Sequence, residues 1–325
     1  MYEIVEKRVL SPEIKLFKIK APLVAKKAEP GQFIALRIHE KGERIPLTIA
    51  DFDREEETIT VIFMEVGKTT KELGRLEKGD FIANFIGPLG RPSEIEDFGT
   101  VVCVGGGVGV APVYPIARAL KEAGNEVIAI IGARCESLLI LENEMHAASS
   151  ELHVATDDGS KGQRGFVTDV LKKVIEERKQ GGKNGISKIW AIGPVPMMDA
   201  VCKTTRPFGI ETIVSLNTIM VDATGMCGAC RVTVGEETKF TCVDGPEFDG
   251  HAVDFAELKK RLCAYRGEEK ESLERYESGH AESGQGGDHG SGDGKGCGCG
   301  HGQEHDNEHE HHRGRGHTCK CGGGN

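Results

Sequence analysis

The chain has 325 residues, a formal net charge of −10 and 28% charged residues. This length allows two or three domains with a substantial core, and no basic stretch is long enough to indicate nucleic-acid binding. The N-terminus lacks the apolar stretch of a signal peptide, and the apolar run from Val101 to Ala117 is too short and too rich in Gly and Pro for a membrane span. We therefore expect a cytoplasmic protein whose eleven cysteines are metal ligands or free thiols rather than disulfides.

Residues 1–97 contain several apolar stretches of strand length. Turn sequences rich in Gly, Pro and charged residues separate them, and they show little helical periodicity. Short strands at such close intervals are typical of a small antiparallel β-barrel. The stretches are IKLFKIKAP, GQFIALRI, TITVIFMEV and DFIANFIGPLG.

From residue 98 to 215, strands alternate with helices. The pattern begins with an apolar strand, TVVCVGG, and a helix, VYPIARALKEAG, that ends at Gly124. Such alternation predicts parallel βαβ units and an open α/β sheet of the nucleotide-binding type. The further elements expected are strand EVIAIIGA, helix SLLILENEMHAA, strand ELHVATDD, helix FVTDVLKKVIEERK, strand KIWAIG, a helix from Pro196 to Thr205 and strand ETIVSL.

The first strand-to-helix turn of this region reads GGGVGVAP. As a G-x-G-x-x-P pattern it places Gly107, Gly109 and Pro112 where an open sheet binds a pyrophosphate, because glycines let the backbone approach the anion and the next helix N-terminus favours it. Proline at the sixth position departs from the usual G-x-G-x-x-G. The alternative is a tight turn that packs a helix on a strand.

Two motifs lie upstream, in the barrel region. Arg44-Ile-Pro-Leu-Thr48 is expected to end a strand, and Gly67-Lys-Thr-Thr70 to open a short helix. Taken singly, each is compatible with an ordinary surface feature. Gly67-Lys68-Thr69 is not a P-loop, because Ile62 stands where that motif needs glycine.

In this order, the motifs resemble those of the ferredoxin–NADP reductase superfamily over roughly residues 1–215. In that superfamily the barrel binds a flavin and the second domain binds a nicotinamide nucleotide. The resemblance implies flavin contacts at Arg44, Pro46, Leu47 and Thr48, flavin-diphosphate contacts at Gly67, Thr69 and Thr70, and contacts near the nicotinamide at Gly193, Pro194, Pro196 and Met197.

Beyond residue 215, an aspartate and three cysteines share a spacing, Asp222-x4-Cys227-x2-Cys230-x11-Cys242. Plant-type [2Fe-2S] sites are spaced C-x4-C-x2-C…C, so aspartate takes the first place, and a carboxylate oxygen can bind ferric iron. Two alternatives stay open. One is zinc, although no second cysteine pair or histidine pair follows locally; the other is a cluster in which Cys263 replaces the aspartate.

A flavin barrel, a nucleotide domain and a [2Fe-2S] module at residues 216–250 together resemble the electron-transfer subunit of dihydroorotate dehydrogenase. The stretches SLNTIMVDATGMCGACRVTV and FTCVDGPEFDGH are more similar to the small (alpha) subunit of NADH-dependent reduced ferredoxin:NADP oxidoreductase. In that family an aspartate and three cysteines hold the cluster, whereas the dihydroorotate type usually has cysteine where Asp222 stands. The resemblance extends to about residue 277.

That resemblance implies electron transfer from NADH through FAD to the cluster. It also implies a large partner subunit with its own flavin and clusters, in a complex that couples NADH, NADPH and ferredoxin by electron bifurcation or its reverse. Three other hypotheses remain: a dihydroorotate dehydrogenase-type subunit, a self-standing NADH flavoreductase, and a metal-handling protein that acts through its tail.

The ends of the second and third nucleotide-domain strands bear on the choice between NAD and NADP. Arg134 suits a 2′-phosphate, but Glu136 would repel one. Asp157 and Asp158 would contact the nucleotide or cap their loop. The stretch ARCESLLILE resembles NAD-linked relatives, which favours NAD(H).

A charged helix is expected over residues 251–277, with apolar side chains on one face. It either caps this chain's own body or docks on the partner. From Gly279 to the end, the chain holds eight of the twelve histidines and four of the eleven cysteines, but almost no aliphatic residue. Residues 278–325 are therefore expected to be disordered. They form either a solvated spacer or a binding segment for divalent Ni, Zn, Co or Cu.

Overall fold

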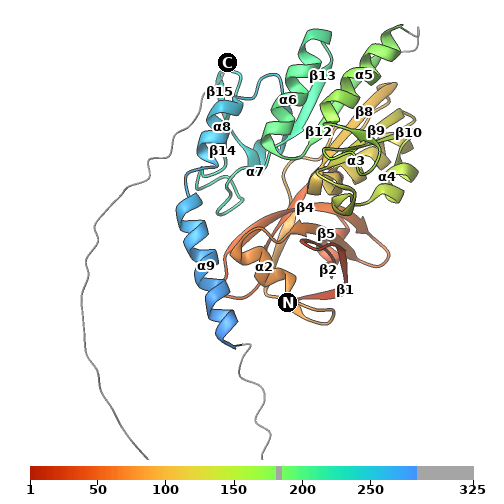
Figure 1. Ribbon diagram of the computed structural model, residues 1–325. Helices are drawn as coiled ribbons and strands as arrows, with labels where there is room; N and C mark the ends of the chain where they lie inside the picture. The colour runs from red at the N-terminus through yellow and green to blue at the C-terminus, as the bar shows by residue number, and fades with distance from the viewer. Residues whose placement is uncertain (181–184, 284–325) are drawn as a thin grey trace, which may run out of the picture. The chain divides into compact units, whose positions relative to one another are not determined.

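The structure, a computed structural model, describes residues 1–180 and 185–283. Residues 1–280 form one compact unit, in which a barrel, a parallel sheet and a small C-terminal module follow one another along the chain (Figure 1). The tail predicted to be disordered or to bind metal comprises residues 278–325. Of these, residues 284–325 lie outside the described part. No helix within the described ranges is long and apolar enough to cross a membrane.

The N-terminal region is a seven-stranded antiparallel sheet, as predicted, in the order β6-β1-β2-β5-β4-β3-β7. Strands β6 and β7 lie at the two edges of this sheet but follow each other directly in the chain. The two edges must therefore lie close together, so the sheet is nearly closed into a barrel. Its interior is apolar, with the rings of Phe17 and Phe63 packed edge to face at 5.1 Å. The elements are β1 (Tyr2–Ser11), β2 (Ile14–Lys20), α1 (Pro22–Ala25), β3 (Phe33–Arg37), β4 (Arg44–Asp53), β5 (Thr58–Met64), α2 (Lys68–Gly74), β6 (Phe81–Ile82) and β7 (Asn84–Leu89).

Two features of the barrel differ from the sequence predictions. The prediction that Arg44 to Thr48 ends a strand is wrong, since Arg44 is the first residue of β4, which pairs with β3 and then with β5 as far as Asp53. Strand β1 was not predicted at all. Two register shifts against β2 interrupt its alternation, so the period of two that marks a half-buried strand is hidden.

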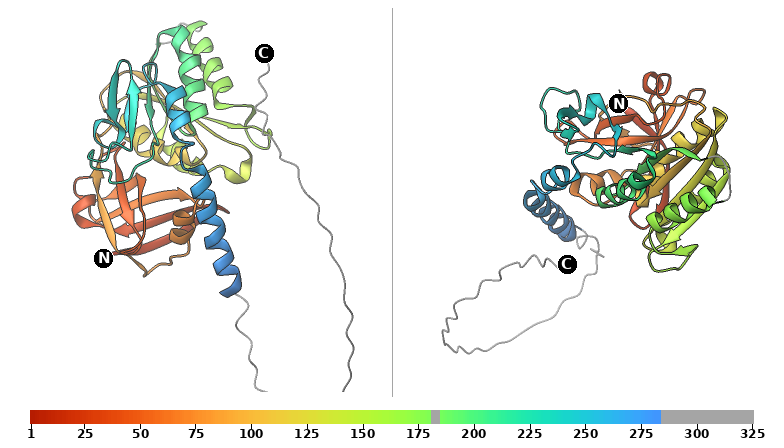
Figure 2. Two further views of the ribbon diagram at one scale, coloured as in Figure 1. Left: turned by 90° about the vertical axis from the view of Figure 1, so that its left-hand side faces the viewer. Right: turned by 90° about the horizontal axis from the view of Figure 1, so that it is seen from above.

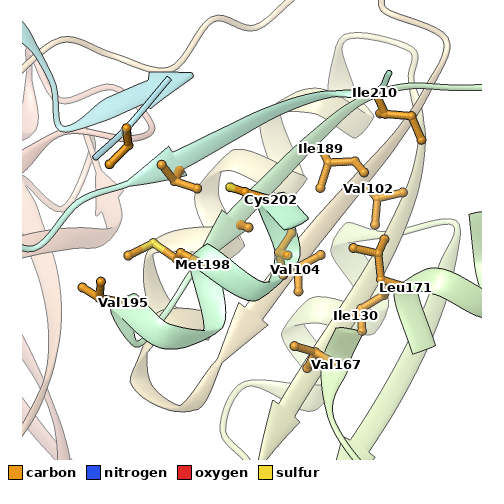
Figure 3. Packing of buried hydrophobic residues seen from close by; sticks show 14 of the residues in the cluster. Val102, Val104, Ile130, Val167, Leu171, Ile189, Val195, Met198, Cys202 and Ile210 are labelled. Atoms are coloured by element: carbon orange, nitrogen blue, oxygen red, sulfur yellow. The ribbon is translucent and has the colours of Figure 1, made fainter. Parts of the chain in front are cut away.

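The second region is a seven-stranded sheet in the order β11-β10-β9-β8-β12-β13-β16, parallel except at β16. Successive residues of β8 point to opposite faces. Val102 and Val104 face α5 and α6 (Figure 3), whereas Val101 and Cys103 face α3 and α4. The sheet is thus covered by helices on both faces, as predicted. Its elements are β8 (Thr100–Gly106), η1 (Gly107–Gly109), α3 (Val110–Glu122), β9 (Glu126–Ala133), η2 (Glu136–Leu138), α4 (Glu142–Ala148), β10 (Glu151–Thr156), β11 (Gln163–Arg164), α5 (Val167–Gln180), β12 (Ile186–Ile192), α6 (Val195–Thr205), η3 (Arg206–Phe208) and β13 (Glu211–Ser215).

One predicted helix of this region is much shorter than expected. The stretch SLLILENEMHAA forms only the end of η2 and the helix α4. Between them Ile140 is buried against the sheet, and Leu141 has a left-handed backbone with φ of 55°. Burial of the isoleucine from an irregular segment therefore outweighs the helical propensity of the leucine-rich stretch.

The C-terminal module contacts both the barrel and the parallel sheet. It consists of a hairpin, β14 (Arg231–Val234) and β15 (Glu237–Phe240), followed by α7 (Thr241–Asp244) and β16 (Glu247–Asp249). Strand β16 pairs with β13 and so extends the nucleotide-type sheet. On the other side, Cys230 and Cys242 pack against Phe33 and Ala35 of the barrel strand β3.

The last described segment is two helices, α8 (Phe255–Arg261) and α9 (Arg266–Ser283), where the sequence predicted one. Leu262 packs against the sheet core, so α8 stays on the body, whereas α9 runs beside the barrel (Figure 2). It is fastened to α2 by the Lys71–Glu277 ion pair and by Arg75, which lies 4.9 Å from the centre of the Tyr276 ring. The helix continues past residue 277, the predicted boundary, to Ser283. The prediction that the disordered tail begins at residue 278 is therefore wrong for residues 278–283.

Candidate functional site

A cavity of about 500 Å³ lies at the carboxyl ends of the parallel strands. Ligands of open α/β sheets bind at this edge. Of the residues predicted from sequence, Gly107 and Pro194 line it, together with Pro196, Met197 and the two specificity candidates Arg134 and Asp157. Its opposite wall is formed by Glu13, Ile14 and Met64 of the barrel.

The two glycines of the G-x-G-x-x-P turn have different tasks. Gly107 has φ of +56°, and a Cβ there would meet nothing within 4 Å, so it opens the backbone towards the cavity. At Gly109 a Cβ would lie 2.4 Å from the carbonyl oxygen of Ile192. Gly109 therefore packs α3 against β12, as the alternative interpretation of this turn proposed. Gly193 is also packed, against Met197, and Pro112 lies partly buried in the first turn of α3.

A second cleft, of about 890 Å³, lies between the barrel and the C-terminal module. Arg44 and Pro46 of the RIPLT motif line one side. Cys227 lines another side and belongs to residues 222–230, here called the cysteine loop. Leu47 and Thr48 follow in β4, where they are partly buried and pair with Ile34 and Phe33 of β3. The remaining lining residues are Glu43, Ile45, Thr218, Ile219, Met220, Val221, Ala229, Arg231, Arg261, Ala264, Tyr265 and Glu269.

Two polar atoms in this lining are buried without a hydrogen-bond partner among the described residues. They are Nε of Arg44 and the hydroxyl oxygen of Thr218. The other end of the Arg44 guanidinium is engaged, because its Nη1 donates to the main-chain carbonyl of Asp222 at 3.3 Å. A buried donor without a partner costs free energy, so the lining fits a ligand that has hydrogen-bond acceptors.

The GKTT motif begins α2 as predicted. The Thr70 hydroxyl accepts from the amide of Gly67 and donates to its carbonyl, both at 3.0 Å, which closes the first turn. Thr69 is buried and its hydroxyl donates to the carboxylate of Glu43, which lines the cleft. The structure thus connects this motif to the cleft through Glu43.

Three predicted cluster ligands, Asp222, Cys227 and Cys230, lie in the loop before β14, and Cys227 lines this cleft. The fourth, Cys242, lies in α7. The Cys230 and Cys242 thiols are buried and 3.2 Å apart, and burial raises the pKa of Cys242 to about 12. Cys227 is exposed. The Asp222 carboxylate accepts from the amides of Thr224 and Cys227, at 2.9 and 2.8 Å, and these bonds, that of Thr224 first, lower its pKa.

In the part of the chain that the structure describes, no group of three or more His, Cys, Asp or Glu side chains is arranged to hold a metal ion. The Asp222 carboxylate is turned to backbone amides, and the Cys230 thiol is hydrogen-bonded to the Cys242 thiol. The donor set nevertheless suits iron, since three thiols and a carboxylate are present and metal binding removes the thiol protons. The rival ligand, Cys263, is exposed and its thiol donates to the carbonyl of Lys259 at 3.3 Å.

One group of hydrogen-bonded side chains, at the junction of the barrel, the sheet and the C-terminal module, was not predicted by any sequence motif. Glu247 of β16 accepts hydrogen bonds from the Ser93 hydroxyl at 2.6 Å and from the Trp190 indole at 3.3 Å. Ser93 belongs to the connection between barrel and sheet, and Trp190 to β12. Loss of solvation at this junction raises the pKa of Glu247. No spacing rule could have found it, because the three residues are far apart in the chain.

A barrel joined to an open parallel sheet, with a cysteine loop beside the barrel's cleft, defines a class of two-domain reductases with an added metal module. Comparison with known families agrees. Residues 103–203 match the oxidoreductase NAD-binding domain, and residues 217–254 match the iron–sulfur cluster binding domain of dihydroorotate dehydrogenase B.

Individual relatives are close in sequence. A dihydroorotate dehydrogenase B (NAD(+)) electron transfer subunit homolog of Thermotoga maritima is 52% identical over 274 residues, which are 84% of this chain and 95% of that protein. A chain of the NADH-dependent reduced ferredoxin-NADP oxidoreductase structure, solved in a study of flavin-based electron bifurcation, is 49% identical with a TM-score of 0.80, over 85% of this chain and 98% of that one. A Neisseria gonorrhoeae ferredoxin NADP+ reductase with bound FAD and NADP has 19% identity and a TM-score of 0.53, over 64% of this chain and 91% of that one. This last likeness concerns the fold alone.

The chain belongs to the family of dihydroorotate dehydrogenase B electron-transfer subunits and their homologues, within the ferredoxin–NADP reductase superfamily. The predicted family and fold class are thereby confirmed.

Proposed function

We propose that this chain is the NADH-oxidising, electron-transfer subunit of a larger complex. It takes electrons from NADH through FAD to a [2Fe-2S] cluster held by Asp222, Cys227, Cys230 and Cys242. When bound, the flavin would accept two electrons from NADH as a hydride and release them singly to the cluster. The relatives support this proposal: one is named an NAD-linked electron transfer subunit, and another belongs to an NADH-dependent ferredoxin-NADP oxidoreductase.

The observation that carries the proposal is the shared wall of the larger cleft. Arg44 and Pro46, from the flavin-type motif, and Cys227, from the cysteine loop, line the same cleft. Arg44 is also bonded to the main chain of Asp222. A flavin and a cluster in these positions would be neighbours, and no further carrier would be needed between them.

The chain's own residues would hold and orient the groups. The free Nε of Arg44 would donate to flavin oxygens, with Thr48 nearby on the same strand, and Thr69 and Thr70 would lie at the diphosphate. Gly107 would admit the nicotinamide nucleotide, and Pro194 would line its cavity. No proton-transfer residue is required, because hydride transfer needs orientation and exclusion of water.

An apolar surface next to the cysteine loop supports the proposed partner subunit. Val221, Met226 and Val243 are 60%, 89% and 41% exposed, and the loop at Gly225 lies against Val243. Exposed apolar groups that gather in this way are typical of protein interfaces. The electrons would leave here, towards a large flavin and iron–sulfur subunit that couples NADPH and ferredoxin by bifurcation or its reverse.

A second candidate follows from the names of the relatives. The chain would serve a dihydroorotate dehydrogenase instead, because several relatives bear that name, one at 34% identity over 71% of this chain. Both candidates use the same cofactors in this chain. They differ in the partner that co-purifies and in whether dihydroorotate or NADPH with ferredoxin reduces the complex.

The cofactor content of the anaerobically purified full-length chain tests the proposal. We expect one FAD, two iron atoms and two sulfide ions per chain, which is the composition of a [2Fe-2S] flavoprotein. Zinc without sulfide would overturn the cluster assignment. Absence of flavin after reconstitution with FAD would overturn the proposed path.

A further inference from the structure

The larger cleft has a third wall, supplied by the turn between α8 and α9. Arg261 ends α8, Ala264 and Tyr265 form the turn, and Glu269 lies in the first turn of α9. The wall, the flavin-type motif and the cysteine loop all line the same cleft. Its position beside the barrel can be followed in Figures 1 and 2.

Contacts at both ends hold this wall in place. The Arg261 guanidinium donates to the carbonyl of Ala229 in the cysteine loop at 2.9 Å. Lys259 of α8 forms an ion pair with Asp199 of α6 at 2.5 Å. On the other side α9 is tied to α2, the helix of the GKTT motif, by Lys71 and Arg75 as described above. These contacts hold the turn in a fixed position in the lining of the cleft.

The chemistry of the wall fits a planar, partly polar group. Tyr265 is 56% exposed, and none of the ring or cation contacts between described residues involves its ring. The cleft also carries three guanidinium groups, of Arg44, Arg231 and Arg261. Deeper in the lining, Thr218 is only 9% exposed and its hydroxyl has no partner among the described residues.

We propose that this turn binds the adenosine half of FAD, with the adenine ring stacked on Tyr265. The inference rests on the proposed function and deepens it, because it assigns residues that the flavin-type motifs do not include. Arginines suit the diphosphate, and an exposed aromatic ring at the mouth of the same cleft suits the base, because aromatic rings stack in offset arrangements. FMN has no adenosine and would leave the wall unused, so the wall makes the site selective for FAD.

The test is a flavin-binding titration of the full-length chain after its flavin has been stripped. FAD and FMN are added separately, and the dissociation constant of each is measured from flavin fluorescence. The wild-type chain should bind FAD more tightly than FMN. Tyr265→Ala should weaken FAD binding by about tenfold, the size of one stacking contact, and leave FMN binding unchanged. Tyr265→Phe, which keeps the ring, should bind FAD like the wild type.

The outcomes separate this inference from the proposed function. If the wild type binds FAD and FMN equally well, or if Tyr265→Ala leaves FAD binding intact, the adenosine site is wrong while the flavin proposal stands. If Tyr265→Ala weakens FAD and FMN equally in a chain with unchanged thermal unfolding, the tyrosine acts on the flavin half, which also overturns the inference. Binding of neither flavin by the wild type would overturn both proposals.

Discussion

The guanidinium of Arg44 donates a hydrogen bond from Nη1 to the main-chain carbonyl of Asp222 at 3.3 Å. The two residues are 178 positions apart, one at the start of a barrel strand and the other in the cysteine loop. This contact joins the flavin-type motif to the predicted cluster ligands. A substitution at either residue should therefore affect both the flavin-type motif and the predicted cluster ligands.

Replacement of Arg44 by alanine should weaken FAD binding roughly 10- to 100-fold, the range for loss of a charged hydrogen bond. Arg44→Lys keeps the charge but not the fork of donors, so its affinity should fall between those of the wild type and the alanine variant. Fluorescence titration with FAD measures both. Wild-type affinity in Arg44→Ala would show that this arginine does not hold the flavin.

Asp222→Asn should lower the iron and sulfide content of the chain, because the neutral amide is a poor ligand for ferric iron. Asp222→Cys should keep the cluster and change the g-values of its reduced EPR spectrum. Cys263→Ser is the matched control and should leave both properties unchanged. A normal spectrum in Asp222→Asn, with a loss in Cys263→Ser, would make Cys263 the fourth ligand.

Alanine at the two glycines of the first βα turn should lower stability by different amounts. Gly107→Ala should cost about 1–2 kcal/mol of stability, from its left-handed backbone, and should weaken NADH binding because the new methyl group points into the cavity. Gly109→Ala should cost about 3 kcal/mol or more, since its Cβ would meet the carbonyl oxygen of Ile192. Urea unfolding measures the two costs. Equal costs would contradict the separate tasks assigned to these residues.

Glu247 should make the stability of the chain fall as the pH rises. Its pKa is raised in the folded chain, so the folded state binds more protons than the unfolded state at pH values above the ordinary glutamate pKa of about 4.5. The stabilisation is complete below that value and is lost as the pH passes the raised pKa.

Glu247→Gln removes this titration, so its free energy of unfolding, measured from acid to neutral pH, should decline less than that of the wild type. The charged and titratable groups that face Glu247 are Lys188, whose charge opposes the shift, and the buried Cys103 thiol. Identical pH profiles for the two chains would show that Glu247 titrates normally.

The parts of the fold that the sequence predicted well are those fixed by local pattern. The strand Thr100–Gly106 has the predicted bounds, because an apolar run that stops at glycines indicates where the strand begins and ends. The start of α2 after Gly67 was equally predictable from turn chemistry. By contrast β16 has only three residues and exists because β13 offers it an edge, which is a non-local pairing.

The same distinction applies to the sites. Regular spacing led to Gly107 and the cysteine loop, since backbone geometry and ligand chemistry impose those spacings, whereas Pro194 was implied by the family resemblance. No spacing links Thr218 or Tyr265 to Arg44, although all three line one cleft. They come together through the packing of α8 and α9 on the body, which only the tertiary structure shows.

The most direct test of the proposed electron path is an anaerobic NADH titration of the full-length chain, followed by absorbance and EPR, with dithionite added at the end. We expect NADH to bleach the flavin, and a [2Fe-2S] signal to appear with NADH or, for a cluster of low potential, with dithionite. A flavin that NADH does not bleach, or a dithionite-reduced chain without any cluster signal, would contradict the proposed electron path.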